Sequence, residues 1–293
     1  MAAVALACGL PLLVPHVAPA AAVTAPRHPE RIIALGLPAD ELTLALVDAS
    51  RIVALDRFAD DVASNVTEQA RAVPTRVSVS AEAVAAMHPD LVLLPAWTGP
   101  ELDASLHRFG IATHRIGTPT SIADVRAAIG DVAALLDARS RGEELLSAMD
   151  ASLAQTRARA HRPMRPTVLL DAGSGLSPGE GTLLAELTEI AGGELLLARS
   201  HDRGLVPLSL ERELSLDPDV LLVDAYRADA RARGVVDAVR DSYGLDPRLS
   251  VLRAVRGHRV RPLAPSLLLT TTHHVAATAD ALWRALHEED PAS

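Results

Sequence analysis

The sequence predicts an α/β protein with two Rossmann-like lobes, one long backbone helix that joins them, and a ligand cleft between the lobes. Three observations lead to this fold class. Apolar strands alternate with helical stretches in residues 30–118 and again in residues 165–287, which is the pattern of α/β lobes. A stretch of helical period, residues 121–161, lies between these two parts. One segment also occurs twice, once in each half.

The N-terminal lobe is predicted from short apolar runs separated by stretches with helical spacing. Uninterrupted apolar runs are typical of strands buried on both faces of a parallel sheet, and apolar residues three and four apart favour helices. The expected strands are 31–35, 51–56, 90–96 and 111–116, the expected helices are 40–47, 81–87 and 101–109, and residues 57–80 are expected to form an irregular loop.

Residues 121–161 are expected to form one helix that links the lobes. Ile122, Val125 and Ile129 begin an apolar stripe that continues to Leu153, with arginine and aspartate on the other side. This length is unusual for a helix in a globular protein. It suits a rigid connection between two lobes.

The strand and helix alternation restarts after Pro166. Gly192 and Gly193 follow the first helical stretch of this lobe, at the position where glycine commonly ends a helix. The expected strands are 167–173, 219–225 and 258–263, and the expected helices are 182–193, 210–216, 235–239, 249–255 and 271–287.

Residues 175–179, GLSPG, match the G-x-S-x-G pattern of a nucleophilic serine after a strand. The mechanism argues against that role, because the oxyanion hole uses the backbone N–H of the residue after the serine. Here that residue is Pro178, which has no N–H. We interpret the segment as a turn and expect no enzymatic activity.

The composition excludes several classes of function. The chain has 293 residues, a net charge of -9 and no lysine, so all 28 basic residues are arginines. An acidic chain argues against non-specific nucleic-acid binding, although a local basic pocket remains compatible with it. The absence of lysine excludes the phosphate-binding loop G-x-x-x-x-G-K-[ST].

Residues 1–22 have the pattern of a secretory signal peptide. They contain an apolar run followed by small residues, with cleavage sites of the A-x-A type after Ala20 or Ala22. The basic residue that usually precedes such a run is missing. Two other interpretations are a lipoprotein signal, with a lipid anchor at Cys8, and an ordinary buried helix. We expect an exported or periplasmic protein.

The repeat lies at the end of a predicted strand in each half. Residues 80–97 align without a gap with residues 209–226, and the match places Glu82 with Glu211 and Trp97 with Tyr226. Ligands of open α/β sheets bind beyond the carboxyl ends of the strands. We therefore expect Trp97 and Tyr226 to form opposite walls of a ligand site. The simpler alternative is that each aromatic covers the core of its own lobe.

These segments together resemble the periplasmic binding proteins of ABC importers for iron chelates, haem and cobalamin, over about residues 30–287. RIIALGLPADELTLAL resembles the opening strand and helix of the family, and LLAELTEIAGG followed by LVPLSLERELSLDPDVLLV resembles its second lobe. The resemblance implies capture of a metal chelate, such as a ferric siderophore, haem or cobalamin, and its delivery to an ABC permease in the inner membrane. It also implies a monomer with little closure on binding, no cofactor and no resident metal.

The family contacts its permease through one glutamate on each lobe. By position the resemblance assigns this role to Glu41, in PADEL, and to Glu186, in LLAEL. Two exposed carboxylates at separated ends of a rigid body would fix its orientation against arginines of the permease. The alternative is that both glutamates lie on an ordinary solvated helix face.

Further ligand contacts are expected from residues in loops near predicted strand ends. Arg57, Arg227 and His201 would suit an anionic chelate. Tyr226 could ligate haem iron through its phenolate, and His273 is a second candidate ligand. Solvated loop charges and a capping histidine are the alternatives.

Two other functions remain open at the level of the sequence. A receptor for bare zinc or manganese would share the two-lobed plan but needs three or four converging His, Asp or Glu ligands. No H-x-H spacing or histidine-rich loop indicates such a set among the 11 histidines. A sensor or scaffold without a transport role is the other alternative, and the docking glutamates would distinguish it.

Overall fold

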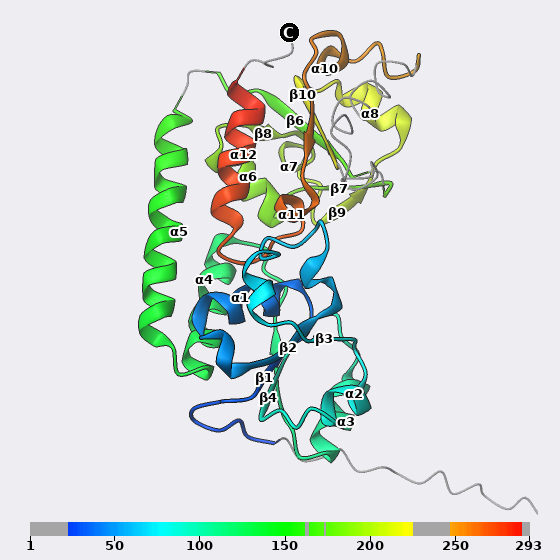
Figure 1. Ribbon diagram of the computed structural model, residues 1–293. Helices are drawn as coiled ribbons and strands as arrows, with labels where there is room; N and C mark the ends of the chain where they lie inside the picture. The colour runs from blue at the N-terminus through cyan, green and yellow to red at the C-terminus, as the bar shows by residue number, and fades with distance from the viewer. Residues whose placement is uncertain (1–22, 162–163, 173, 225–246, 289–293) are drawn as a thin grey trace, which may run out of the picture.

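The computed structural model describes residues 23–161, 164–172, 174–224 and 247–288. Figure 1 shows two α/β lobes, one above the other, with a long helix running along one side of both. The expected signal peptide, Tyr226, Arg227 and the expected helix 235–239 lie outside the described residues. No helix within these ranges is long and apolar enough to cross a membrane.

The N-terminal lobe is built on a parallel sheet of five strands in the order β3-β2-β1-β4-β5. The central strands are completely buried because their apolar side chains are covered on both faces, as expected for a parallel sheet. The strands are β1 (Ile32–Ala34), β2 (Ile52–Asp56), β3 (Arg76–Val77), β4 (Leu91–Pro95) and β5 (Ala112–Ile116).

Helices of this lobe follow the strands in sequence and pack beside the sheet. Pro38 and Pro100 lie in the first turns of α1 and α3, where a missing backbone N–H costs no hydrogen bond. The helices are α1 (Leu37–Leu46), α2 (Ala81–Ala85) and α3 (Pro100–Arg108), with 3-10 turns η1 (Ala49–Arg51), η2 (Arg57–Asp60) and η3 (Gln69–Ala72). Residues 57–80, expected to be an irregular loop, therefore contain two short turns and β3.

The linking segment consists of two helices, so the prediction of a single helix over residues 121–161 was wrong. They are α4 (Ile122–Leu135) and α5 (Arg139–Arg159). The chain turns at Asp137, whose φ of 55° lies in the left-handed region. Aspartate adopts this conformation more readily than most residues, and no glycine or proline marks the break.

The second of these helices, α5, is the element that joins the lobes. It packs against α4 and α1 on the N-terminal side and against α12 (Val275–His287) and α6 (Leu183–Ile190) on the C-terminal side. At Gly142 a side chain would meet the Ala133 Cβ at 2.5 Å, so glycine allows α5 to pack closely on α4. The backbone helix expected from the sequence is thus α5 alone.

The C-terminal lobe has a parallel sheet of four described strands in the order β11-β10-β6-β8. A short antiparallel pair, β7 with β9, lies beside it. The strands are β6 (Thr167–Asp171), β7 (Leu176–Pro178), β8 (Glu194–Leu195), β9 (Leu205–Pro207), β10 (Val220–Asp224) and β11 (Val260–Leu263). The GLSPG segment is therefore mostly strand rather than turn, and Ser177 is completely buried in it.

The remaining helices in the described part of this lobe are short, apart from the terminal one. They are α7 (Leu196–Arg199), α8 (Leu210–Leu216), α10 (Arg253–Arg256) and α11 (Pro265–Leu268). The terminal helix α12 starts at Val275 rather than at residue 271, because residues 269–274 form the connection from α11.

The repeated segment folds in the same way in both lobes. Ser80 and Ser209 each accept a hydrogen bond from the third residue of the following helix, α2 or α8. After the helix, His88 and Asp217 both have positive φ, 49° and 40°, and each is followed by Pro-Asp and a buried strand. The internal duplication seen in the sequence is therefore a duplication of three-dimensional structure.

One cluster of buried side chains extends through both lobes and the linking helices. It includes Ile32 and Leu93 of the N-terminal sheet, Met149 of α5, and Val168 and Leu222 of the C-terminal sheet. Each sheet has a second cluster on its other face. The lobes are therefore joined by continuous apolar packing and not only by the chain.

Candidate functional site: the edges where the two sheets face each other

The two sheets point the carboxyl ends of their strands toward each other. In Figure 1 the N-terminal strands run upward from the lower edge, while β6 and β10 run downward from the top of the C-terminal lobe. The loops after the strands therefore meet in the middle of the molecule. This edge is where open α/β sheets bind ligands.

Trp97 lies directly after β4, at this edge of the N-terminal lobe. It is 68% exposed. The indole lies against Gly36, after β1: a Cβ at Gly36 would be 3.4 Å from the Trp97 Cζ2 atom. Trp97 therefore does not cover the core of its own lobe. It presents an aromatic face to the solvent at the end of the sheet.

An apolar cavity of about 320 Å³ opens at the corresponding edge of the C-terminal lobe. Its wall is formed mainly by leucines from β6, β7, α6, β9 and α11, and the polar groups among them are threonines, Ser174 and Asp224. Leu205 and Leu269, which line it, are more than half exposed. A surface of this kind suits a ligand with a large apolar face.

Glu41 lies at the junction between the lobes and is not exposed. Only 2% of its surface is accessible. Its Oε1 atom accepts a hydrogen bond from Asn65 at 2.9 Å, and its Oε2 atom accepts hydrogen bonds from the hydroxyls of Thr270 and Thr272. Both threonines belong to the C-terminal lobe, so this carboxylate joins the lobes. The prediction that Glu41 is an exposed docking residue was wrong.

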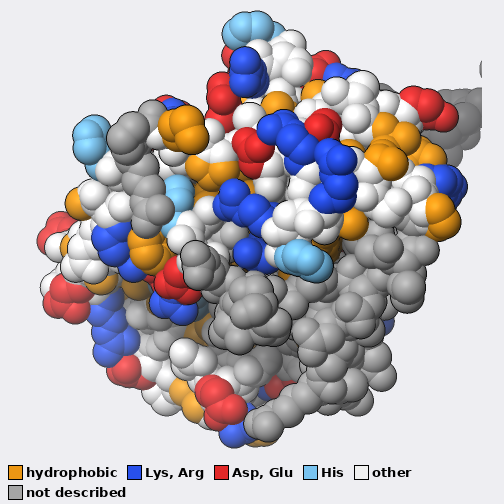
Figure 2. Space-filling model, turned by 90° about the horizontal axis from the view of Figure 1, so that it is seen from above, with side chains coloured by type: hydrophobic (Ala, Val, Ile, Leu, Met, Phe, Trp, Pro, Cys, Tyr) orange, Lys and Arg blue, Asp and Glu red, His pale blue; other side chains and the backbone are white. Residues whose placement is uncertain are grey.

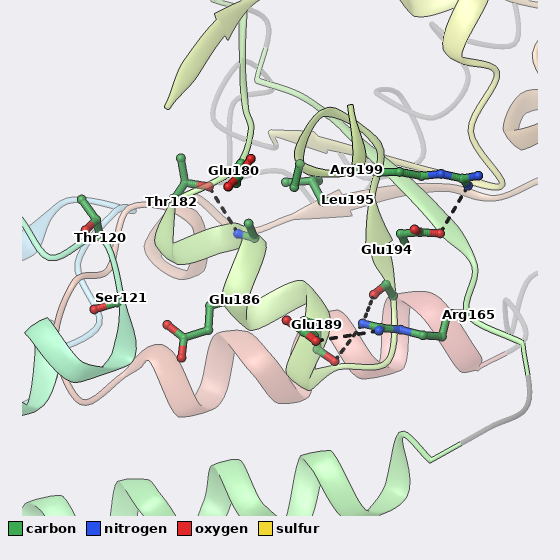
Figure 3. A pocket seen from close by; sticks show the side chains of 14 residues that line it. Thr120, Ser121, Arg165, Glu180, Thr182, Glu186, Glu189, Glu194, Leu195 and Arg199 are labelled. Atoms are coloured by element: carbon green, nitrogen blue, oxygen red, sulfur yellow. Dashed lines mark hydrogen bonds and ion pairs between the residues drawn. The ribbon is translucent and has the colours of Figure 1, made fainter. Parts of the chain in front are cut away.

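Glu186 has the corresponding place on α6 of the other lobe. Its carboxylate accepts a hydrogen bond of 2.7 Å from the backbone N–H of Ile122, the first residue of α4. Figure 3 shows it directed toward the Thr120–Ser121 segment, across a polar pocket. A carboxylate is favourable at a helix N-terminus because of the free N–H groups and the helix dipole. Glu186 is thus half-buried and already holds one hydrogen bond within the protein.

A second buried carboxylate, Asp40, lies beside Glu41 on α1. Its Oδ1 atom accepts a hydrogen bond from the backbone N–H of Asp56 at 3.0 Å, whereas Oδ2 has no hydrogen-bond partner in the described residues. Burial, with a smaller contribution from the negative charge of Asp56, raises the pKa of Asp40 to about 8. Asp40 is therefore protonated at neutral pH.

The Asp40→Asn variant should be less sensitive to alkaline pH than the wild type. The pKa of Asp40 is higher in the folded than in the unfolded state, so the wild type loses stability as the pH rises from about 4 through about 8. The free energy of unfolding falls by on the order of 1.4 kcal/mol for each unit of difference between the folded and unfolded pKa values. Urea unfolding at pH 5, 7 and 9 measures it: the stability difference between variant and wild type should move in favour of the variant as the pH rises. Parallel pH profiles would contradict the assignment.

A known protein family matches this chain across both lobes. The profile of the family described as "Periplasmic binding protein" matches residues 32–267. The chain belongs to the periplasmic binding protein family. The resemblance found in the sequence is confirmed.

Individual relatives in this family agree with that assignment. Two "Cobalamin-binding protein" sequences from strains of Halobacterium salinarum are each 29% identical over 242 residues, which cover 78% of this chain and 63% of theirs. The chain thus spans less than two thirds of the length of these relatives.

The periplasmic heme-binding protein RhuT from Roseiflexus sp. RS-1 superposes with a TM-score of 0.70 at 25% identity, covering 88% of this chain and 99% of that one. The heme-binding protein BhuT, in complex with two hemes, gives a TM-score of 0.72 at 25% identity, covering 87% and 97%.

The other predicted contacts of this periplasmic binding protein lie in different surroundings. Arg57 follows β2 at the same sheet edge, and its guanidinium lies 4.5 Å above the ring of Phe58. His201 is exposed and pairs with Glu180 at 3.2 Å. It does not line the apolar cavity.

His273 is partly buried at the lobe junction, and its ring centroid lies 4.0 Å from that of His274, with the two rings tilted by 37°. Burial lowers the pKa of His273 to about 4, so the ring is neutral at physiological pH. The adjacent ring, His274, also has a pKa lowered by burial. The pair is thus part of the interior between the lobes.

One matched pair of residues was visible in the sequence but was not assigned a role. Glu82 and Glu211 correspond in the repeat, and both are exposed in the first turns of α2 and α8. The pKa of each is lowered mainly by a hydrogen bond from its own backbone N–H. A hydrogen bond from the serine that caps the helix makes a smaller contribution. Both are therefore charged. Figure 1 places α2 and α8 on different lobes, on the side of the molecule away from α5.

Charges are unevenly spread over the surface. Figure 2, which views the molecule from the C-terminal lobe, shows arginine side chains gathered near the middle of this face, with acidic groups around them. The acidic net charge of -9 therefore coexists with locally basic surface.

Proposed function

We propose that this protein is an exported substrate-binding protein that captures a metal chelate and delivers it to an ABC permease. The observation that carries the proposal is that the facing edges of the two sheets present an exposed Trp97 on one lobe and an apolar cavity on the other. The ligand would lie between them, with its flat face on the indole and its apolar edge on the leucines. Tyr226, which ends the second copy of the repeat, is proposed as a further wall.

Cobalamin is the chelate that we place first. The cobalamin-binding relatives support it, and so does the coordination chemistry. Cyanocobalamin brings both axial ligands of its metal with it, whereas haem often takes an axial ligand from the protein. Among the described residues that were candidates for this, His201 pairs with Glu180, and His273 is partly buried against the ring of His274. Haem, with Tyr226 as its ligand, is the second candidate because heme-binding structures are similar in fold.

Bare zinc or manganese gains no support from the described part of the chain. No group of three or more His, Cys, Asp or Glu side chains lies together there as a metal site. In the proposed function the protein performs no covalent chemistry and needs no cofactor. It acts as a monomer in the periplasm, either free after cleavage of residues 1–22 or anchored through a lipid on Cys8.

Docking on the permease is proposed to use Glu82 and Glu211 in place of Glu41 and Glu186. The two glutamates of the repeat are exposed, charged and equivalent in the two lobes, whereas the two predicted ones form hydrogen bonds within the protein. A pair of carboxylates on separate lobes would fix how the protein sits on arginines of the permease.

The ligand site is tested by replacing Trp97 with alanine. We expect cyanocobalamin affinity, measured by isothermal titration calorimetry, to fall roughly 10- to 100-fold, because an aromatic anchor of a binding site contributes this much. The Trp283→Phe variant is the matched control, since Trp283 lies on α12 against Arg159 and away from the proposed site. Haemin and ferric siderophores are titrated in parallel.

The outcomes of this titration separate the candidates. Binding of haemin alone would replace cobalamin by haem. Unchanged affinity in Trp97→Ala would remove Trp97 from the site. If none of the chelates binds the wild type, the chelate receptor is excluded, and the sensor or scaffold function takes its place.

A further inference from the structure

Trp97 lies in a turn whose backbone is fixed by several hydrogen bonds. The backbone N–H of Thr98 donates to the Pro95 carbonyl at 3.1 Å, which closes the turn after β4. On one side the indole rests against Gly36, whose φ of 84° and lack of a side chain leave room for Pro95 and the ring. The backbone beneath the ring is thus fixed, while the rest of the ring is exposed to solvent.

The guanidinium of Arg115 binds this turn from the neighbouring strand. Arg115 lies on β5, opposite Leu94 of β4. Its Nη1 atom donates to the carbonyls of Pro95 and Ala96, each at 3.2 Å, and to the carbonyl of Thr98. Its Nη2 atom donates to the Asp103 carboxylate on α3. One side chain therefore connects the turn, its strand and the following helix.

The pattern of acceptors points to a specific role. Ala96 and Thr98 are the residues on either side of Trp97, so the backbone is held on both sides of the aromatic residue. Carbonyls in an exposed turn can be satisfied by water and need no arginine. The Arg115 side chain is itself only 30% exposed, and its charge is paired with Asp103. A purely stabilising ion pair would not require all three carbonyls of one turn.

We propose that Arg115 is the residue that positions Trp97 and keeps the indole ready to receive the flat face of the ligand. A wall that is ordered before binding loses less conformational entropy when the ligand arrives, and affinity rises accordingly. The affinity measurement that tests this proposal rests on the proposed function. The measurement of how rigidly Trp97 is held in the free protein does not.

The experiment uses the full chain with Trp283→Phe, so that Trp97 is the only tryptophan. Arg115→Gln and Arg115→Lys are compared in this background. Arg115→Lys keeps the charge and reaches fewer carbonyls at once. Arg108→Gln is the matched control, because Arg108 is an N-lobe arginine that bonds Ser105 and not the turn. Circular dichroism confirms that each variant is folded.

Two measurements decide the proposal. Time-resolved fluorescence anisotropy of the free protein should show a fast component for Trp97 in Arg115→Gln, a smaller one in Arg115→Lys, and none in Arg108→Gln. Cyanocobalamin affinity should fall roughly 2- to 12-fold in Arg115→Gln, the cost of ordering one or more side chains on binding. In a Trp97→Ala background, Arg115→Gln should cause no further loss.

The proposal is overturned if the anisotropy of Trp97 is the same in the Trp283→Phe parent and in Arg115→Gln. It is also overturned if Arg115→Gln weakens binding equally with and without Trp97, because Arg115 would then act on the ligand or the fold directly. If the wild type binds no chelate, the proposed function fails, while the anisotropy still decides whether Arg115 orders Trp97.

Discussion

Replacing Glu82 and Glu211 together by alanine should abolish delivery of the ligand to the permease and leave ligand binding intact. Both side chains are exposed at the starts of α2 and α8, at equivalent positions of the two lobes. Each would form a charge-assisted hydrogen bond with the permease, and the two together would determine the docked orientation. We expect uptake of cyanocobalamin by proteoliposomes that contain the permease to fall roughly 100-fold at limiting binding protein.

The single variants should show smaller losses, because one remaining carboxylate still holds one lobe. Glu143→Ala with Glu144→Ala is the matched control: it removes the same charge from exposed positions on α5, on the opposite side of the molecule. Normal uptake by the Glu82 and Glu211 double variant, with normal ligand binding, would contradict this docking surface.

Replacing Glu41 by alanine should destabilise the protein by about 2–4 kcal/mol, because two buried donors and one partly buried donor lose an acceptor. The donors are Asn65 of the N-terminal lobe and Thr270 and Thr272 of the C-terminal lobe, with both threonines almost inaccessible to solvent. Chemical unfolding at pH 7 measures the loss. The variant should also lose ligand affinity, since the two walls of the site would no longer be held at a fixed spacing.

Glu41→Gln should lose much less stability, because the amide keeps one oxygen acceptor and threonine hydroxyls can reorient to accept from its nitrogen. Glu143→Ala on the exposed face of α5 should change stability by less than about 0.5 kcal/mol. Equal stability of Glu41→Ala and Glu143→Ala would show that the contacts between the lobes do not depend on this carboxylate.

The longer strands of both sheets could be predicted from their apolar runs, whereas the two-residue strands β3 and β8 were missed. β4 and β10 match the expected residues to within one or two positions, and the repeat that contains them also predicted their equivalence in space. The pair β7 and β9 was missed because each strand has three residues and contains a proline, which is a poor signal for a strand. The break between α4 and α5 depends on one left-handed aspartate, Asp137.

The candidate site could be predicted only in part, because side-chain contacts across the lobes have no local signal. Trp97 was found from its place after a buried strand. Glu41 was misassigned because two of its partners, Thr270 and Thr272, lie 229 and 231 positions away in the chain. Arg115 was not considered, since alternation along β5 gives no reason to expect that it reaches the turn of the adjacent strand.

Glu82 and Glu211 are a different case, because the signal was present. The alignment of the repeat paired them, and a charged residue kept at the same place in both lobes had no packing role to explain it. The family resemblance directed attention to the glutamates of PADEL and LLAEL instead. Our docking proposal follows the equivalence within the chain, because Glu82 and Glu211 are both exposed.

The continuous core and the Glu41 contacts also determine where the energy for ligand release must come from. Because the two halves share buried side chains, opening by thermal motion is costly, and in the proposed function this would keep a bound ligand in place. Separating the lobes would require that these contacts be broken by mechanical work. In the proposed function the nucleotide-driven cycle of the permease supplies that work through one docking contact on each lobe. The stiffness of the receptor determines how much work is needed.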